Sequence, residues 1–360
     1  MELGSEFHLN LEELHTAEDS VFQYMEKFSC LFFDSGRSAL FALYQTIRPT
    51  VIFLPEYLCE SVLQPILDEC SIFYYPLSPS FEPDFSGIPD IVSGLDQSER
   101  ARPFLYIMHY FGKLISDSSI SKVRELKQMF DFQIIEDTTH SLLSSPLTVG
   151  DFGICSLRKW FPIPDGGVLY SELPLPAITG IQPGRVNQKA YGAILKSLFL
   201  KGLGDFNDLY RTMFTKAEEA LDSQNNIFAM SDYSKFLLSC FSISTIRQKR
   251  TENYNNLLDF FESYNPAAAV FPKLSGTPFV FPVLAKHRDA LRSYLIEHQI
   301  YCAVHWPVSH TPFEHHEAAR HFSAHLLSLP VDQRYGTAHM EYLKNTLQQY
   351  TVEKGELLWD

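Results

Sequence analysis

The segment Gly153–Tyr170, GICSLRKWFPIPDGGVLY, contains a single lysine, Lys159. Ser156 lies three residues before Lys159, and the pair Gly166-Gly167 begins seven residues after it, ahead of an apolar run. A lysine placed between a strand-like segment and a Gly-Gly turn is suited to form a Schiff base with pyridoxal phosphate (PLP). The amine must be held near an aldehyde, and the serine hydroxyl can reach the phosphate. The alternative is a surface lysine in a loop between two strands.

A carboxylate at the end of a predicted strand supports the cofactor interpretation. Phe132–His140 reads FQIIEDTTH, an apolar run that ends in Glu136 and Asp137. Open α/β sheets place their ligand sites at the carboxyl ends of buried strands. Asp137 is predicted to keep a pyridine nitrogen protonated, whereas Glu136, one residue away, should point to the other face of the strand. The alternative is an ordinary acidic residue in a turn.

A predicted helix start provides a candidate phosphate site. Ser35-Gly36-Arg37-Ser38 precedes the run Ala39–Tyr44, which has strong helix formers and a helical apolar spacing. Ser35 is the predicted N-cap, and Gly36 leaves room for a ligand beside the backbone. Free N–H groups at a helix start bind phosphate, with Arg37 as a possible additional charge. The alternative is a helix cap without a ligand.

Taken in order, these segments resemble the sugar aminotransferases of the DegT/DnrJ/EryC type, a branch of the fold-type-I PLP-dependent enzymes. The resemblance extends from about Leu31 to the last helix. It is carried by Ser35–Leu40, Leu54–Tyr57, His109–Gly112, Glu136–His140, Ser156 with Lys159 and Gly166-Gly167, Trp306–His310 and Leu327–Val331.

The resemblance implies PLP as the cofactor and gives roles to individual residues. The implied catalytic residues are Lys159, Asp137 and His140, with His140 near the cofactor ring. The implied cofactor-binding residues are Ser35, Gly36, Arg37, Ser38, Tyr57, Cys59, Asp137, His140, Ser156 and Lys159. The motif near the C-terminus implies that Trp306 and His310 lie beside the substrate.

The sequence departs from the family pattern at three points. Cys59 stands where an aromatic ring usually stacks on the cofactor, so His140 or another side chain would cover the ring. The serine-to-lysine spacing is three residues instead of the family's five. Ile227–Met230 lacks the asparagine and arginine of the family's segment that reaches the neighbouring subunit, although Asn225 and Asn226 lie just upstream.

Composition restricts the class of protein. The chain has 360 residues, of which 45% are hydrophobic, enough for a large domain and a smaller one. A net charge of −14 argues against a nucleic-acid partner, since phosphate backbones require clustered Lys and Arg. Six scattered cysteines without a CxxC pair, no apolar run of about 18 residues and no signal peptide predict a cytoplasmic protein that is not embedded in a membrane.

A group of histidines near the C-terminus raises the question of a metal site. The histidines are His305, His310, His315, His316, His321 and His325. His321 and His325 have the i, i+4 spacing of a ligand pair on a helix, but no carboxylate or cysteine framework accompanies them. We therefore predict no metal and a solvated, histidine-rich helix.

The pattern of elements predicts the fold class and the domains. Alternating strands and helices favour a mostly parallel sheet, and the resemblance implies a mixed, mainly parallel seven-stranded sheet with a small α+β C-terminal domain. We expect a large domain at 1–248, with a helical insertion at about 183–226, and a small domain at 249–360. The expected strands are 51–54, 72–75, 104–109, 133–137, 153–157, 168–170, 278–284 and 300–305. The expected helices are 38–47, 60–67, 119–129, 253–261, 287–299 and 337–349.

The resemblance also implies a function. The leading hypothesis is transamination of a keto sugar, nucleotide-linked, with glutamate as amino donor, by a homodimer. A second is a PLP-dependent sugar dehydratase, although that branch replaces the Schiff-base lysine with histidine. A third is a catalytically silent scaffold that keeps the fold.

Overall fold

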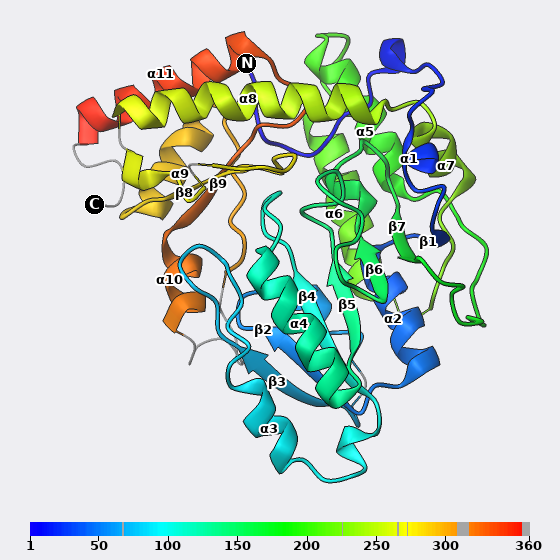
Figure 1. Ribbon diagram of the computed structural model, residues 1–360. Helices are drawn as coiled ribbons and strands as arrows, with labels where there is room; N and C mark the ends of the chain where they lie inside the picture. The colour runs from blue at the N-terminus through cyan, green and yellow to red at the C-terminus, as the bar shows by residue number, and fades with distance from the viewer. Residues whose placement is uncertain (67, 225, 265, 272, 308–316, 355–360) are drawn as a thin grey trace.

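A mixed sheet of seven strands lies at the centre of the molecule (Figure 1). The computed structural model describes residues 1–66, 68–224, 226–264, 266–271, 273–307 and 317–354. The strands lie in the order β1 (Ser29–Phe33), β7 (Gly167–Ser171), β6 (Phe152–Cys155), β5 (Gln133–Asp137), β4 (Pro103–Met108), β2 (Val51–Pro55) and β3 (Ser71–Tyr75). The strands from β6 to β3 are parallel, whereas β7 is antiparallel to both neighbours.

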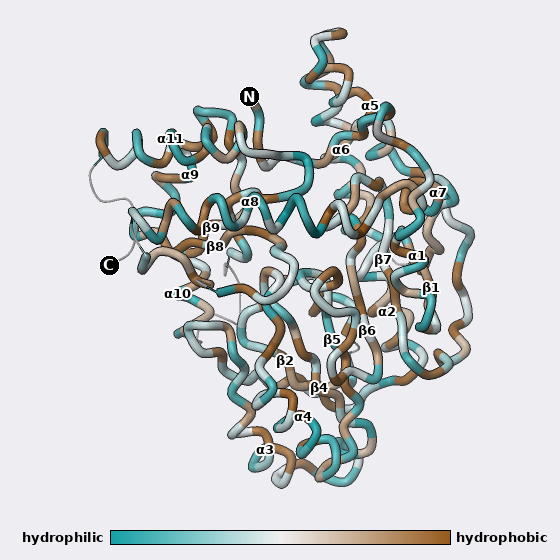
Figure 2. Tube along the Cα trace, turned by 45° about the horizontal axis from the view of Figure 1, so that its top comes forward, coloured by the Kyte–Doolittle hydropathy of each residue, from teal (hydrophilic) through white to brown (hydrophobic). Residues whose placement is uncertain are grey.

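The apolar runs of the sequence become the buried strands. Every residue of β2, β4 and β7 is buried, and brown hydrophobic segments follow β2, β4 and β5 in Figure 2. Strands covered on both faces have continuous apolar sequences, because neither face meets water. The predicted fold class, a mixed and mainly parallel seven-stranded sheet, is confirmed.

Helices follow most of the strands. They are α1 (Val21–Tyr24), α2 (Gly36–Ile47), α3 (Ile88–Gly94), α4 (Asp117–Phe130), α5 (Gln188–Leu200), α6 (Asn207–Asp222), α7 (Asp232–Leu238) and α8 (Ile243–Tyr264). Side chains cap several of them: Ser35 Oγ accepts from the Ser38 N–H, and Ser116 Oγ accepts from the Ser119 N–H. Figure 1 shows α4 lying across β4 and β5, while α2 packs against β1, β6 and β7.

The C-terminal part of the chain forms a second, smaller core. This part of the chain contains β8 (Phe281–Leu284), β9 (Leu326–Leu329), α9 (Arg288–Glu297), α10 (Glu317–His325) and α11 (Thr337–Lys354), with β8 and β9 antiparallel. The buried residues of α10, Ala319 and Phe322, pack in the larger core instead. Helix α8 joins both cores: Ile243 and Ile246 pack in the core of the large sheet, and Leu257 and Phe261 pack in the second. The predicted boundary at 248/249 therefore falls inside one continuous helix.

The N-terminal segment connects the same two regions. Leu3 is fully buried in the smaller core and exchanges main-chain hydrogen bonds with Gln299 and Tyr301. Leu9 packs in the larger core, and its N–H donates to the carbonyl of Ala193 on α5. The first residues thus tie the second core to the helical insertion.

Some predicted elements differ from the structure. The expected helix at 60–67 is only a short 3₁₀ helix, Glu60–Val62, because Pro65 cannot continue a helix. The expected strand at 300–305 forms only isolated bridges, from Ile300 to Leu3 and from Ala303 to Ser328. Strand β1 and helix α3 were not predicted, whereas the helical insertion is present as α5 and α6. No helix of the described residues is long and apolar enough to cross a membrane.

Candidate active site

Most of the predicted cofactor residues line a single cavity of about 240 Å³. They come from the start of α2, the loop after β2, the end of β5 and the segment after β6. These residues are Ser35, Gly36, Arg37, Cys59, Asp137, His140, Ser156 and Lys159. Trp306, which was predicted to lie beside the substrate, lines the same cavity. Ser38 and Tyr57 lie outside the lining, and His310 lies outside the residues that the structure describes.

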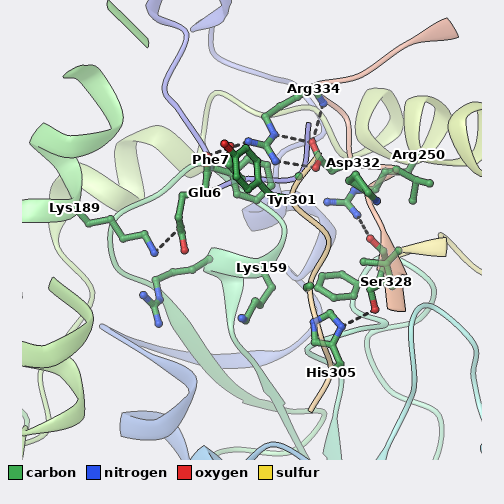
Figure 3. Close-up of a pocket in the computed structure, with 18 of the residues that line it drawn as sticks. Glu6, Phe7, Lys159, Lys189, Arg250, Tyr301, His305, Ser328, Asp332 and Arg334 are labelled. Atoms are coloured by element: carbon green, nitrogen blue, oxygen red, sulfur yellow. Dashed lines mark hydrogen bonds and ion pairs between the residues drawn. The ribbon is translucent and has the colours of Figure 1, made fainter. Parts of the chain in front are cut away.

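Lys159 lies between this cavity and a second one. It ends a short 3₁₀ helix, Leu157–Lys159, that follows β6 directly. Its side chain lines the 240 Å³ cavity and a neighbouring cavity of about 370 Å³, shown in Figure 3. Within the described residues, no hydrogen bond or ion pair involves its amine. Lys159 is exposed, and its side chain borders two adjoining cavities.

Asp137 and Glu136 point to opposite faces of β5, as the period of a strand requires. Asp137 lines the cavity, where its carboxylate accepts from Tyr106 Oη at 2.6 Å and from the Thr139 N–H at 2.8 Å. Burial raises the pKa of Asp137 above its usual value, against the effect of these two hydrogen bonds. A cation beside this carboxylate would therefore favour its ionised form.

Glu136 lies on the other face of β5, away from the cavity, and its contacts hold neighbouring segments of the fold together. Its carboxylate accepts from His109 Nε2 at 2.7 Å and from the N–H groups of Thr148, Val149 and Gly150. His109 Nδ1 accepts from the Ile115 N–H, so the proton of the neutral ring is on Nε2. Burial acts to raise the pKa of Glu136, but these donors outweigh it and lower the pKa to about 2.

The start of α2 forms one wall of the cavity. A Cβ atom on Gly36 would lie 3.4 Å from Ser156 Cβ, so the missing side chain leaves space between the helix start and Ser156. A Cβ atom on Gly167 would lie 2.1 Å from the carbonyl carbon of Ser35, so only glycine lets β7 pack directly behind this loop. Ser38 Oγ instead donates to Asp34 Oδ1 at 2.6 Å, away from the cavity.

Arg37 is the charged residue of this wall. Its Nη1 donates to the carbonyl of Leu221 and its Nη2 to Asp222 at the end of α6. Its Nε is buried without a partner. The insertion therefore holds the guanidinium in the cavity wall and leaves one donor unused.

Aromatic rings form the opposite wall. His140 stacks on Phe279 with ring centroids 4.2 Å apart and on Trp306 at 5.4 Å, with nearly parallel planes. Burial, with the nearby His305 and Lys159, holds the pKa of His140 well below its usual value. His140 is therefore neutral, and its buried Nδ1 has no partner. Tyr57 supports this wall from behind, 5.4 Å from Trp306.

Three further residues line the site that were not predicted to belong to it. Arg158 and His305 line both cavities, and so does Glu218 from α6. Glu218 accepts from Arg158 Nη1 at 2.7 Å and from Lys189 Nζ at 2.8 Å. Burial acts to raise the pKa of Glu218, but Arg158 and Lys189 lower it to about 2. Arg158 adjoins Lys159, and His305 adjoins Trp306 and belongs to the group of histidines near the C-terminus, whereas Glu218 had no sequence signal.

The larger cavity lies between the two cores and is strongly charged (Figure 3). The N-terminal segment Gly4–Phe7 forms part of its wall, opposite His305 and Ser328. Glu6 pairs with Lys189 at 2.9 Å. His305 Nδ1 is 2.8 Å from Ser328 Oγ, and burial and the nearby Lys159 lower the pKa of His305 to about 3.

The described residues contain no group of three or more His, Cys, Asp or Glu side chains that could hold a metal ion. His321 and His325 lie on α10 with ring centroids 4.9 Å apart, and neither lines the two cavities. His315 and His316 lie outside the described residues. All six cysteines are free thiols.

Comparisons with known proteins find structural likeness at low sequence identity. No protein-family model matches the sequence, and no curated protein matches it. PseC of Helicobacter pylori, an aminotransferase involved in pseudoaminic acid biosynthesis, is 14% identical; the match covers 98% of this chain and 100% of that one, with a TM-score of 0.66. A DegT DnrJ EryC1 StrS aminotransferase from Brucella abortus is 13% identical, with 92% and 88% covered and a TM-score of 0.62.

A third structure carries a form of the predicted cofactor. NtdA from Bacillus subtilis, solved with bound pyridoxamine phosphate (PMP), is 12% identical, with 91% and 74% covered and a TM-score of 0.62. These similarities show that the chain has the fold of these aminotransferases. The resemblance that the sequence motifs indicated is thus confirmed for the fold.

Proposed function

We propose that this chain is a PLP-dependent aminotransferase that transfers an amino group from an amino acid to a keto sugar. The observation that supports this most is the position of Lys159. Its side chain lines the cavity that Asp137 and the start of α2 also line, and it lines a larger polar cavity as well. A cofactor in the first space and a substrate in the second would meet at this amine.

The chemistry of the smaller cavity fits PLP. The Nε atoms of Arg37 and Arg158 and the Nδ1 atom of His140 are buried without partners, and all three residues line it. Gly36 and Ser156 leave a space at the start of α2, where N–H groups and the helix dipole favour a phosphate. Asp137 supplies a buried carboxylate for a protonated ring nitrogen, and Lys159 supplies the amine.

Each residue then has a distinct task. When bound, PLP supplies an aldehyde that links to amines and a ring that accepts electrons from the adjacent carbon. Lys159 would hold the cofactor through its amine and, once the amino donor has taken its place, would move a proton as general base. Asp137 would keep the ring nitrogen charged, and the His140 and Trp306 rings would exclude water from that side of the cavity.

The finer assignment is a nucleotide-linked keto sugar with glutamate as donor. The family resemblance of the motifs supports it, and PseC, whose structure is similar, is an aminotransferase involved in the biosynthesis of pseudoaminic acid. The lysine at position 159 argues against the sugar dehydratase alternative, whose branch carries histidine there.

A half-reaction without sugar tests the proposal. The protein loaded with PLP should absorb visible light, and L-glutamate should bleach this band and release 2-oxoglutarate in stoichiometric amount. The same protein without amino acid is the control. If glutamate and a panel of other amino acids all leave the band unchanged, transamination is wrong and a silent scaffold becomes the better interpretation.

A further inference from the structure

Cys59 places a thiol in the wall of the smaller cavity, at the position where the family pattern has an aromatic ring. The residue follows β2 and precedes the short 3₁₀ helix Glu60–Val62. Its side chain is partly exposed, and it lines the cavity together with Ser61, Asp137 and Lys159. Ser61 Oγ donates to Cys59 Sγ at 3.0 Å, and this contact fixes the position of the sulfur. The thiol therefore borders the space proposed for the cofactor.

The other cysteines are less suited to react. Four of them are buried and line neither cavity of the site, namely Cys70, Cys155, Cys240 and Cys302. Cys30 is the other partly exposed thiol, but it lies on β1 outside both cavities, and burial raises its pKa to about 11. Because the thiolate is the form that attacks disulfides, this shift makes Cys30 slow to react. A reagent that enters the smaller cavity thus meets Cys59.

A second feature of the same cavity indicates that it takes an anionic ligand. The Nε atoms of Arg37 and Arg158 and the Nδ1 atom of His140 are buried without a hydrogen-bond partner, and all three residues line the cavity. His140 is only 2% exposed, so bulk water does not satisfy its ring. Unpaired buried polar atoms are costly, and a ligand that brings acceptor oxygens to the two guanidinium groups would offset part of this cost.

We propose that Cys59 is a covalent modification site that forms a mixed disulfide with small anionic disulfides and thereby excludes the cofactor. The Cys59 thiolate attacks one sulfur of a disulfide R–S–S–R. A bond forms between Cys59 Sγ and that sulfur, the S–S bond of the reagent breaks, and R–S⁻ leaves and takes up the proton that the thiol has lost. Cys59 is oxidised and the departing half of the reagent is reduced, so an excess of thiol reverses the reaction.

The adduct and the cofactor compete because both need the same space. An adduct on Cys59 Sγ fills the cavity that Asp137 and Lys159 line, so it keeps PLP from both residues. Bound PLP in turn covers the sulfur and protects it. This competition rests on the proposed function, because it takes PLP as the ligand of the cavity, whereas the reactivity of Cys59 does not depend on that function.

Reaction with dithiobis(nitrobenzoate), an anionic aromatic disulfide, tests the inference on the protein without PLP. We expect one fast equivalent of released thionitrobenzoate, with the label on Cys59 in a peptide map. PLP at about 100 times its dissociation constant should slow this phase about 100-fold, because only the unliganded fraction reacts. The absence of a fast equivalent, or a fast label on another cysteine, overturns the proposal.

A neutral disulfide tests the anionic class of the reagent. Dithiodipyridine carries no carboxylate, so Arg37 and Arg158 do not attract it. Each rate at Cys59 is divided by the rate of the same reagent with mercaptoethanol, which removes the difference in intrinsic reactivity. The quotient should be larger for dithiobis(nitrobenzoate). Equal quotients would show that the cavity does not select anions.

Two variants assign the fast phase to a residue. Cys59→Ser should lose the fast phase, and treatment with the reagent should leave its absorption with PLP as it was before treatment. Cys30→Ser is the matched control, since it removes the other partly exposed thiol and should react at the wild-type rate. Treated wild type should develop no visible band with PLP until excess thiol removes the adduct. A fast phase that persists in Cys59→Ser rejects the site.

The outcomes separate this inference from the proposed function. If glutamate bleaches the PLP-loaded protein but Cys59 does not react, the function is retained and the modification site is rejected. If Cys59 reacts and PLP slows the reaction, while no amino acid bleaches the band, the modification site is retained and transamination is rejected. If PLP binds, as its absorption shows, but does not slow the reaction, or if the protein binds no PLP, the exclusion of the cofactor is wrong.

Discussion

Lys159 is the residue whose identity matters most for the chemistry. Its amine makes no hydrogen bond or ion pair within the described chain, so it is available to form a covalent bond. We expect Lys159→Ala to abolish the visible absorption of the PLP-loaded protein and leave at most weak, non-covalent binding of PLP. Borohydride reduction of wild type followed by peptide mapping should find the label on Lys159. A label on another lysine would contradict the assignment.

Asp137 provides the second residue-scale prediction. In Asp137→Asn, the amide oxygen can still accept from the Thr139 N–H, and the amide nitrogen can donate to Tyr106 Oη, so the fold should persist. The negative charge beside the ring nitrogen is lost, and turnover should fall about a thousandfold, or roughly 4 kcal/mol in the barrier. Steady-state rates, with cofactor content measured by absorbance, check this. Near-normal turnover would exclude the role.

Ser156 is predicted to donate to the cofactor phosphate. Ser156→Ala should weaken PLP binding by about 1–3 kcal/mol, the cost of losing a hydrogen bond to a charged group. Fluorescence titration of the apo-protein with PLP measures this. Ser121→Ala is the matched control, because Ser121 is exposed and its hydroxyl bonds only the carbonyl of Asp117 on its own helix. Equal affinities in all three proteins would argue against the phosphate site.

At the scale of elements, β5 places two acids with opposite roles on its two faces. Glu136 fixes the turn Thr148–Gly150 and the ring of His109 behind the sheet. Its pKa is lowered to about 2 in the folded protein from an unfolded value of 4.5. Its ionised form therefore stabilises the fold above about pH 4.5, and this contribution is lost as pH falls toward 2.

Glu136→Gln should consequently lower the free energy of unfolding by about 2–4 kcal/mol at pH 7. The difference from wild type should shrink as pH falls below 4.5. Urea unfolding at several pH values measures both effects. Glu125→Gln, an exposed acid on α4, should change stability by less than about 0.5 kcal/mol. A difference for Glu136→Gln that does not depend on pH would refute the electrostatic explanation.

At the scale of the whole molecule, we predict a homodimer. Fold-type-I enzymes that this chain resembles build the active site at a subunit interface, and two-fold dimers are the commonest closed assembly. The α5–α6 pair exposes Tyr191, Leu200, Leu203 and Leu209, which such an interface would cover. Sedimentation equilibrium should give twice the chain mass at micromolar concentration. A single-chain mass across that range would contradict the prediction.

The sequence by itself determined most strands of the sheet and the positions along the chain of the residues proposed to bind the cofactor. Apolar runs such as those of β2 and β4 are decided locally, since a strand buried on both faces needs an uninterrupted run. The acids that end β5 and the glycine pair at the start of β7 can likewise be recognised in the sequence. Ligand sites of such sheets lie at the carboxyl ends of strands, and two backbones can approach closely only where one of them carries glycine.

Only the tertiary structure decided which distant residues join the site. Glu218 lies on α6 and belongs to no motif, and its position in the site depends on how α6 and the second core pack around the cavities. The edge strand β1 was missed because its register is set by pairing with β7 and not by its own pattern. Such contacts are fixed by packing between segments that lie far apart in the sequence. A local sequence pattern depends only on neighbouring residues and therefore does not identify a partner elsewhere in the chain.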